Sequence, residues 1–586
     1  MRPSILLSLI VPTLLSARAL AAPDLLPAEP WRVVRPDEAA MRVETIQLER
    51  PVGGQSSAVK LTVLRATDPF YHLQIAKEIP QPIAEATRLR FSFYARSRTE
   101  NPMRAIVEKA EPPYTPAVEI RPTLTPEWRL YTMTGISRAY PARGLGVRFQ
   151  VGHKEGEIEV AAVRLEDLGP DPVMMNARAA IQPDAVDQRI RQNRTASLKI
   201  VVRDASGNPI KNASVSVRQT RHAFLFGSNI FGLNTSDTSQ TQRLYQQRFK
   251  DLLNFATLPF YWGSFEPQEG QKAYDRLETM ARWCRDNGLM TKGHPLIWHE
   301  VYPRWAPAEP DAAIPLLKGR VYDIITHFKG LIPYWDVLNE ANNAPDYAQT
   351  GTGAWIKRDG AARVVATALR WAREASAGAN NVLLYNDFNT GQANVQLLTE
   401  LQTMKSLPDA IGIQSHMHGG TWPLEEVWAT VERFAVFKRP IHFTEATIVS
   451  GPRPAGPGSP WVTTPEGERA QADYVERFYS ILFSHPAVEA ITWWDFSDLN
   501  AWQQAPAGFL RKDMSPKPAY DRLMALIKGN WWTKAEATTG ATGSCTIRAF
   551  QGTHEVTVTD GRGRKATIAV EVPLKRKTAT VSVTLR

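Results

Sequence analysis

Two glutamates that end apolar runs are the residues of this sequence best suited to chemistry. Glu340 follows the run 335–339, and Glu445 follows the run 441–444. Buried parallel strands have this composition, and barrels of such strands present active-site groups at their carboxyl ends. Two carboxyl groups at such a rim can hydrolyse a glycoside, one as acid/base and the other as nucleophile or base. Either segment alone also fits an ordinary solvated strand end, so the assignment depends on the neighbouring motifs.

Other apolar runs in the same region also end in polar or aromatic residues. His294 and Trp298 end one run, Gln414 and His416 end another, and Trp494 follows a third. Aromatic rings suit the C–H faces of sugars, whereas amides and imidazoles suit their hydroxyl groups. Any one of these residues could be a packed core side chain. Their shared position at predicted strand ends indicates a carbohydrate-binding rim.

The elements that must position these residues lie between residues 221 and 530. Eight short apolar runs occur there, around residues 224–230, 252–258, 290–298, 334–340, 382–388, 410–416, 441–446 and 490–496. Helical patterns such as 361–375 and 469–483 separate them. Strands that alternate with helices in this rhythm predict a (β/α)8 TIM barrel. Glu340 and Glu445 then end the fourth and seventh strands.

The flanking segments predict a multidomain protein with β domains on both sides of the barrel. Residues 22–172 alternate apolar and polar residues, for example at Leu89, Phe91 and Phe93, which predicts an antiparallel β-sandwich. Residues 173–220 are expected to form a linker, a short helix at 183–194 and a small β unit. Residues 531–586 alternate again and predict a small C-terminal β domain.

The amino terminus predicts export. Residues 1–21 contain a positive charge, an apolar run and a small-residue cleavage site, as in a signal peptide. We therefore expect a secreted or periplasmic protein, and no later stretch is long enough for a membrane span. The net charge of +10 is scattered along the chain, which argues against nucleic-acid binding.

The sequence has two cysteines and no spacing typical of a metal site. Cys284 and Cys545 lie in different predicted domains. In an oxidising compartment they could form a disulfide, but two free thiols fit the sequence equally well.

The motifs of the barrel region resemble those of glycoside hydrolase family ten, mostly retaining endo-β-1,4-xylanases. That family carries Gly-His-Thr-Leu-Val-Trp-His, Trp-Asp-Val-Val-Asn-Glu and Thr-Glu-Leu-Asp on strands three, four and seven. Residues 293–299, 335–340 and 444–447 correspond to them, in the same order, and the resemblance covers about 221–525. It implies that Glu340 is the acid/base, that Glu445 is the nucleophile, and that no metal or organic cofactor is required.

The same resemblance implies a set of residues that contact the substrate. Asn339 would bind the sugar 2-hydroxyl, and His416 would hold Glu445. The complete set implied by the family is His294, Trp298, Asn339, Gln414, His416, Trp494 and Trp502.

Several positions depart from the family pattern. The strand-two Glu, Asn and Lys that grip the glycone sugars correspond here to Thr257, Leu258 and Tyr261. The Asp two residues beyond the nucleophile is Thr447, and the Gly after the strand-eight tryptophan is Asp495. We expect Thr257, Leu258 and Tyr261 to form an apolar, aromatic wall. Tyr261 and Asp495 are therefore added to the candidate substrate-binding residues.

The resulting hypothesis is a secreted, retaining β-glycoside hydrolase that cleaves a plant-type polysaccharide, with xylan as the default substrate. One alternative is hydrolysis of a different or substituted β-glycan. An alternative from another class is a catalytically silent carbohydrate-binding protein. The sandwich at 22–172 resembles carbohydrate-binding modules, although a purely structural role also fits its pattern. The expected partner is a polysaccharide, and the sequence leaves the oligomeric state open.

Overall fold

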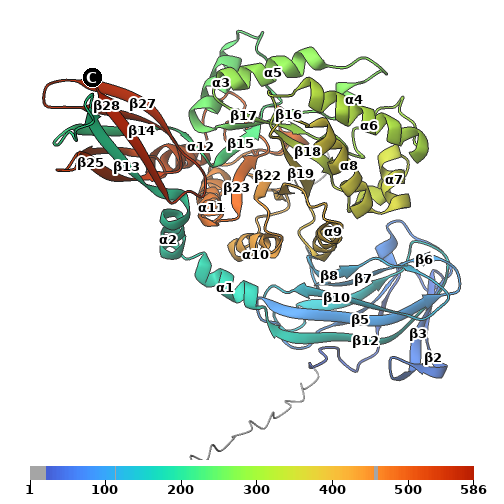
Figure 1. Ribbon diagram of the computed structural model, residues 1–586. Helices are drawn as coiled ribbons and strands as arrows, with labels where there is room; N and C mark the ends of the chain where they lie inside the picture. Colours follow the sequence, from blue (N-terminus) through green and yellow to red (C-terminus); the bar gives the residue numbers. More distant parts are fainter. Residues whose placement is uncertain (1–21, 113, 455–458) are drawn as a thin grey trace, which may run out of the picture. The chain divides into compact units, whose positions relative to one another are not determined.

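The computed structural model describes residues 22–112, 114–454 and 459–586, and the chain divides into two compact units (Figure 1). The first unit ends at Asn176, and the second begins at Ala177. The predicted signal peptide, residues 1–21, lies outside the described residues. Within those residues, no helix combines the length and apolarity that crossing a bilayer requires.

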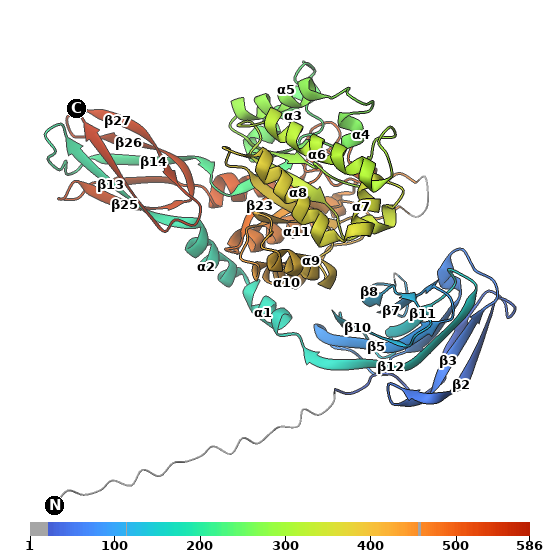
Figure 2. The same ribbon diagram turned by 45° about the vertical axis from the view of Figure 1, so that its right-hand side comes forward.

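The first unit is an antiparallel β-sandwich (Figure 2). One sheet has the order β1 (Arg32–Val34), β4 (Gln74–Glu78), β11 (Leu145–Gln150), β7 (Arg104–Lys109) and β8 (Pro116–Ile120). The other has the order β10 (Arg129–Ile136), β5 (Thr87–Ser97), β12 (Gly156–Pro170), β3 (Gln55–Val63) and β2 (Met41–Val52). Alternate residues of β5 are buried, and the ring of Phe93 meets that of Phe149 from β11 at 5.0 Å. The core therefore lies between the two sheets.

The second unit contains a closed barrel of eight parallel strands. In chain order these are β15 (Leu225–Asn229), β16 (Phe255–Pro259), β17 (Met290–His294), β18 (Tyr334–Asn339), β19 (Val382–Asp387), β20 (Ala410–Ile413), β22 (Ile441–Ile448) and β23 (Val488–Trp493). Each strand pairs in parallel with the next, and β23 pairs with β15 to close the ring. The predicted fold class is confirmed.

A helix follows every barrel strand. The eight are α3 (Gln240–Leu252), α5 (Tyr274–Asp286), α6 (Pro310–His327), α8 (Ala361–Ala375), α9 (Gln392–Thr403), α10 (Leu424–Ala435), α11 (Pro465–Ser484) and α12 (Pro518–Ala525). Helix α11 begins where the Thr464 side chain accepts a hydrogen bond from the Gly467 amide at 3.0 Å, with Pro465 at the first helical position. Helix α8 buries Val364, Val365 and Ala368 along one face, the spacing of an amphipathic helix.

The β unit before the barrel and the β domain after it form one sandwich, so the prediction of two separate β units is wrong. Strands β13 (Thr195–Asp204) and β14 (Ser214–His222) pair with four strands of the carboxyl-terminal segment. These four are β24 (Lys534–Thr538), β25 (Ser544–Phe550), β26 (Gly552–Thr559) and β28 (Thr578–Leu585), and β27 (Lys565–Val572) pairs with β26. The two sheets share one core, in which Leu198 and Val217 meet Val556 and Val583. Local patterning shows that a strand exists but not which distant strand it pairs with.

The structure also bears on two smaller expectations, those for the segment before the sandwich and for the two cysteines. Helix α2 (Pro183–Arg194) forms at 183–194, but the expected linker before it contains a further helix, α1 (Pro172–Ala180). Cys284 is buried in α5, and Cys545 is half-buried in β25. Both are free thiols, so the disulfide alternative is excluded.

Candidate active site

The two catalytic candidates lie at the carboxyl ends of β18 and β22. Glu340 is the first residue after β18, and Glu445 lies within β22. Both side chains are buried. Glu340 has a φ of 57°, and its amide donates a 2.9 Å hydrogen bond to the Asn386 carbonyl. A left-handed backbone at a residue other than glycine is strained and is common at functional sites.

A network of three amide side chains joins the two carboxyl groups. Asn339 donates to Glu340 Oε1 at 3.0 Å, and Gln414 donates to the same oxygen at 2.7 Å. Asn386 donates to Glu445 Oε1 at 2.6 Å and to Asn339 Oδ1 at 2.8 Å. The structure thus brings together residues from β18, β19, β22 and the segment after β20. Asn386 was missed as a site residue, although its position at the polar end of β19 was a usable signal.

The surroundings of Glu445 keep its carboxylate ionised. Burial alone would raise the pKa of Glu445, but nearby positive charge and hydrogen bonding lower it overall. His416 Nε2 lies 3.0 Å from Glu445 Oε2, and His294 Nε2 lies 3.8 Å from Oε1. Buried Lys292 contributes further positive charge. An ionised carboxylate is what a nucleophile requires before attack.

A buried ion pair orients His294 towards Glu445. Asp336 Oδ2 lies 2.8 Å from His294 Nδ1 and 2.7 Å from Lys292 Nζ. Burial would raise the pKa of Asp336, but Lys292 and His294 together lower it. The Asp336 contact fixes the His294 ring. Lys292 and Asp336 were missed because their partners come from neighbouring strands.

Glu340 has the opposite protonation behaviour. Burial is the main cause that raises the pKa of Glu340 to about 7, and the charges of Glu445 and Asp387 add to it. Hydrogen bonds from Gln414 and Trp298 oppose this shift, the latter at 3.2 Å to Oε2. Neighbouring carboxyl groups with pKa values pushed apart are the arrangement of an acid/base paired with a nucleophile.

Comparison with known proteins identifies the family. The profile of "Glycosyl hydrolase family 10" matches residues 217–526, more than half of the chain. The chain belongs to glycosyl hydrolase family 10. This makes the barrel an O-glycoside hydrolase domain of the endo-1,4-β-xylanase-like type.

Individual relatives of this family 10 chain are distant. The "Anti-sigma-I factor RsgI6" of Acetivibrio thermocellus is 28% identical over 390 residues, which cover 65% of this chain and 47% of that protein. "Endo-1,4-beta-xylanase B" of Thermotoga neapolitana is 26% identical over 285 residues, covering 46% of this chain and 78% of that one. The chain thus spans about half the length of the first relative. The crystal structure of xylanase 10B from Thermotoga petrophila with xylobiose has 22% identity, a TM-score of 0.45, and coverage of 53% of this chain and 95% of that chain.

In this family 10 barrel, the hydroxyl of Thr447 contacts His416 at the position where the family pattern has an aspartate. His416 Nδ1 lies 3.0 Å from Thr447 Oγ1, while its Nε2 faces Glu445. The hydroxyl still orients the ring, but it does not stabilise a positive charge on His416 as a carboxylate would.

The prediction that Thr257, Leu258 and Tyr261 form an apolar wall is wrong for Thr257 and Leu258. Thr257 and Leu258 have no exposed surface. Both residues belong to β16 and are enclosed by packing, Leu258 within the main hydrophobic core. Of the three, Tyr261 alone is partly exposed, and its ring lies 5.5 Å from that of His294 and 5.6 Å from that of Trp298.

Residues after β23 pack against the two histidines that lie beside Glu445. Trp494 is buried, with its ring 5.4 Å from His294 and 5.8 Å from His416. Trp502 is 46% exposed, and its ring lies 4.7 Å from His416. Asp495 Oδ1 accepts a 3.1 Å hydrogen bond from the Trp502 amide, so its observed contact holds the Trp502 segment. Burial raises the pKa of Asp495 to about 7.

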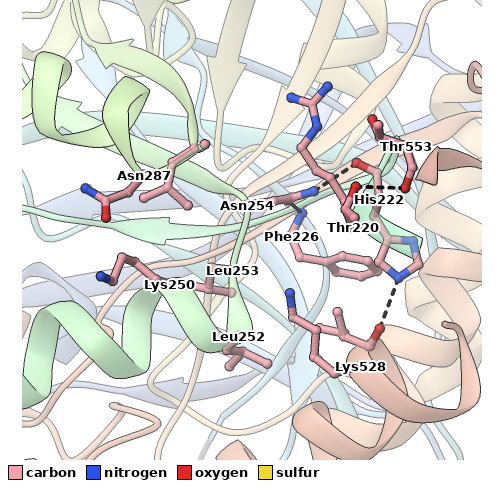
Figure 3. A pocket seen from close by; sticks show the side chains of 14 residues that line it. Thr220, His222, Phe226, Lys250, Leu252, Leu253, Asn254, Asn287, Lys528 and Thr553 are labelled. Carbon is pink, nitrogen blue, oxygen red and sulfur yellow. Dashed lines mark hydrogen bonds between the residues drawn. The ribbon is translucent and has the colours of Figure 1, made fainter. Parts of the chain in front are cut away.

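A separate pocket of about 430 Å³ lies at the opposite end of the strands (Figure 3). Its lining includes Phe226 at the start of β15 and Asn254 and Leu289 just before β16 and β17. Asn254 donates to the His222 carbonyl at 3.1 Å, and His222 Nε2 lies 3.0 Å from the Ile527 carbonyl. These buried contacts join the barrel to the carboxyl-terminal sandwich, and neither Glu340 nor Glu445 lines the pocket.

Proposed function

We propose that this protein is a secreted, retaining endo-β-1,4-xylanase-like hydrolase that cleaves a plant-type polysaccharide by double displacement. The observation that carries the proposal is the opposite pKa shift of Glu340 and Glu445 within one amide network. Family membership supports the reaction class.

In the first step, Glu445 attacks the anomeric carbon while protonated Glu340 gives its proton to the departing oxygen. The products are a covalent glycosyl-Glu445 ester and a free leaving-group sugar. Loss of the Glu445 charge then lowers the proton affinity of Glu340. In the second step, Glu340 takes a proton from water, and the water oxygen displaces Glu445 from the sugar.

Surrounding residues keep these two roles distinct. His294 and His416 favour the anionic form of Glu445 before attack. Asn386 positions both Glu445 and Asn339, so substrate contacts of Asn339 would be aligned with the nucleophile. Trp298, Trp494 and Trp502 offer ring surfaces for sugar stacking.

The stereochemistry of the product tests this mechanism. Proton NMR of the first-formed product from a β-linked substrate should show the β-anomer, because two displacements restore the configuration. An α-anomer formed first would contradict the assignment of Glu445 as nucleophile.

Secretion is supported by the amino-terminal sequence, and polysaccharide binding is supported by the names of the relatives. The amino-terminal residues 1–21 have the composition of a signal peptide. Several relatives carry the name endo-1,4-β-xylanase. Amino-terminal sequencing of the protein recovered from the culture medium or periplasm tests the export proposal, and a start near residue 22 is expected.

A different or substituted β-glycan remains the second candidate substrate, favoured by the burial of Thr257 and Leu258 at positions where the family grips the glycone. The other alternative is a catalytically silent carbohydrate-binding protein, and one relative at 28% identity is named as an anti-sigma-I factor rather than as a hydrolase. Hydrolysis of an aryl β-glycoside panel separates them, because a silent barrel would cleave none of its members.

A further inference from the structure

His299, in the segment after β17, has a buried imidazole for which the reaction gives no role. The residue is 1% exposed, yet within the described part of the chain neither ring nitrogen has a hydrogen-bond partner. Buried polar atoms in proteins are nearly always paired, so an unpaired imidazole requires an explanation.

The imidazole faces two carboxylates. His299 Nε2 lies 3.9 Å from Glu340 Oε2, and the next residue, Glu300, carries a second, partly buried carboxylate. One ligand atom from each of the three residues lies within 4.8 Å of the other two. Gln414 and Asn339 both donate to Glu340 Oε1, whereas Oε2, which accepts from Trp298 at 3.2 Å, is the oxygen turned to this group.

A neighbouring side chain supports this arrangement. Tyr347 donates a 2.9 Å hydrogen bond to Glu300 Oε1, and its ring lies 4.2 Å from that of His299. Tyr347 thus contacts two of the three residues. Outer contacts of this kind orient ligands in metal sites.

One imidazole nitrogen and two carboxylate oxygens form a donor set suited to Zn²⁺. Open zinc sites use three protein ligands and leave a fourth position for water. Zinc–ligand distances of about 2.0–2.2 Å require the ligand atoms to approach one another slightly. The partly exposed side chain of Glu300 can make this adjustment without disturbing the core.

We propose that His299, Glu300 and Glu340 form a zinc site that reversibly inhibits the enzyme. A zinc ion bound there would hold Glu340 Oε2, and the acid/base carboxyl could no longer give or take a proton. The inhibitory part of this inference rests on the proposed function of Glu340, whereas binding itself does not.

The test uses the full chain after treatment with a chelator. Calorimetry with ZnCl₂ measures binding, and hydrolysis of an aryl β-glycoside over the same zinc range measures inhibition. We expect binding of one zinc ion at the site, parallel loss of activity, and full recovery with EDTA. Mg²⁺ should have little effect, because it prefers oxygen ligands in octahedral geometry.

Three variants locate the site. Glu300→Gln removes a ligand and should weaken zinc binding by more than about tenfold. Loss of a residue that only orients a ligand already lowers metal affinity by about 10–100-fold. Tyr347→Phe removes only the hydrogen bond to Glu300 and should weaken binding by about tenfold. Glu269→Gln, at an exposed glutamate outside the cluster, makes the same charge change and should bind zinc as the wild type does.

The outcomes separate this inference from the proposed function. Absence of zinc binding at millimolar concentration, or equal binding by Glu300→Gln and wild type, overturns the zinc site even if hydrolysis is normal. Zinc binding that depends on Glu300 supports the site even if no glycoside is hydrolysed, and in that case it is the proposed function that fails. Zinc binding without loss of activity in an active enzyme overturns the inhibition.

Discussion

At Glu340 and Glu445, one side-chain type takes two protonation states because its neighbours differ. The carboxyl of Glu445 faces two imidazoles, whereas that of Glu340 faces neutral amides, an indole and other carboxylates. Although both groups are buried, these neighbours lower the pKa of Glu445 and leave the pKa of Glu340 raised to about 7.

Replacing either glutamate by glutamine tests these roles. Glu340→Gln and Glu445→Gln should each lower kcat by at least about 10²–10⁴-fold, the contribution of acid/base assistance alone. The thermal unfolding midpoint should change little, because the replacement keeps the shape of the side chain. Near-wild-type turnover in either variant, measured on its best substrate, would contradict the assignment.

The pH profile follows from the two pKa shifts. Glu340 must be protonated for the first step, so kcat/KM should fall as the pH rises through about 7. Glu445 must be ionised and its pKa is lowered, so the acidic limb should lie below 4.5, the ordinary value. In Glu340→Gln, assayed with an aryl glycoside whose leaving group needs no proton, the alkaline limb should disappear. Persistence of that limb would assign it to another group.

Tyr261 is the residue on which glycone specificity is expected to depend. It stands where the family pattern has a lysine, and sites that hydrogen-bond a hydroxyl can discriminate by about 10⁴–10⁵-fold. We expect weak cleavage of short linear xylo-oligosaccharides and better cleavage of a decorated or different β-glycan. Tyr261→Lys should improve cleavage of the linear substrates, whereas Tyr261→Phe, the matched control, should not. Linear substrates cleaved as well as by ordinary family members would refute this expectation.

At the scale of elements, the strands and their terminal residues were predictable, but their mutual contacts were not. Apolar runs and motif order located β18 and β22 and the two candidate catalytic glutamates. The ion pair of Lys292 with Asp336 joins adjacent strands, and single-strand patterns contain no information on such contacts. Burial of Leu258 likewise depends on how β16 packs, which its residue type alone does not determine.

The segment after β23 allows a test of how one residue holds an element. Asp495→Ala removes the acceptor for the Trp502 amide, so the exposed indole should lose its position. We expect KM to rise while kcat changes little, because the proton-transfer groups are untouched. Asp495→Asn keeps an acceptor oxygen and should restore a near-wild-type KM. Equal effects of the two variants would show that the negative charge, rather than the hydrogen bond, matters.

At the scale of the whole molecule, the first unit has its own core and its own pair of sheets. We expect residues 22–176, produced alone, to fold cooperatively and to bind a polysaccharide weakly. Affinity electrophoresis across soluble glycans measures the binding, and the same protein run in a glycan-free gel provides the baseline. Cooperative unfolding without retardation on any glycan would favour a structural role for this unit.

The sandwich is built from segments before and after the barrel in the sequence, so its strands leave the ribosome at different times. The last residue of β14 precedes the first residue of β24 by 312 positions (534 − 222). At about 5–20 residues per second, a ribosome needs about 15–60 s to supply the missing partners. During that interval β13 and β14 have unpaired edges and an uncovered apolar face, a state prone to aggregation. Chains that stop before residue 534 should therefore be poorly soluble even though they contain the entire catalytic barrel.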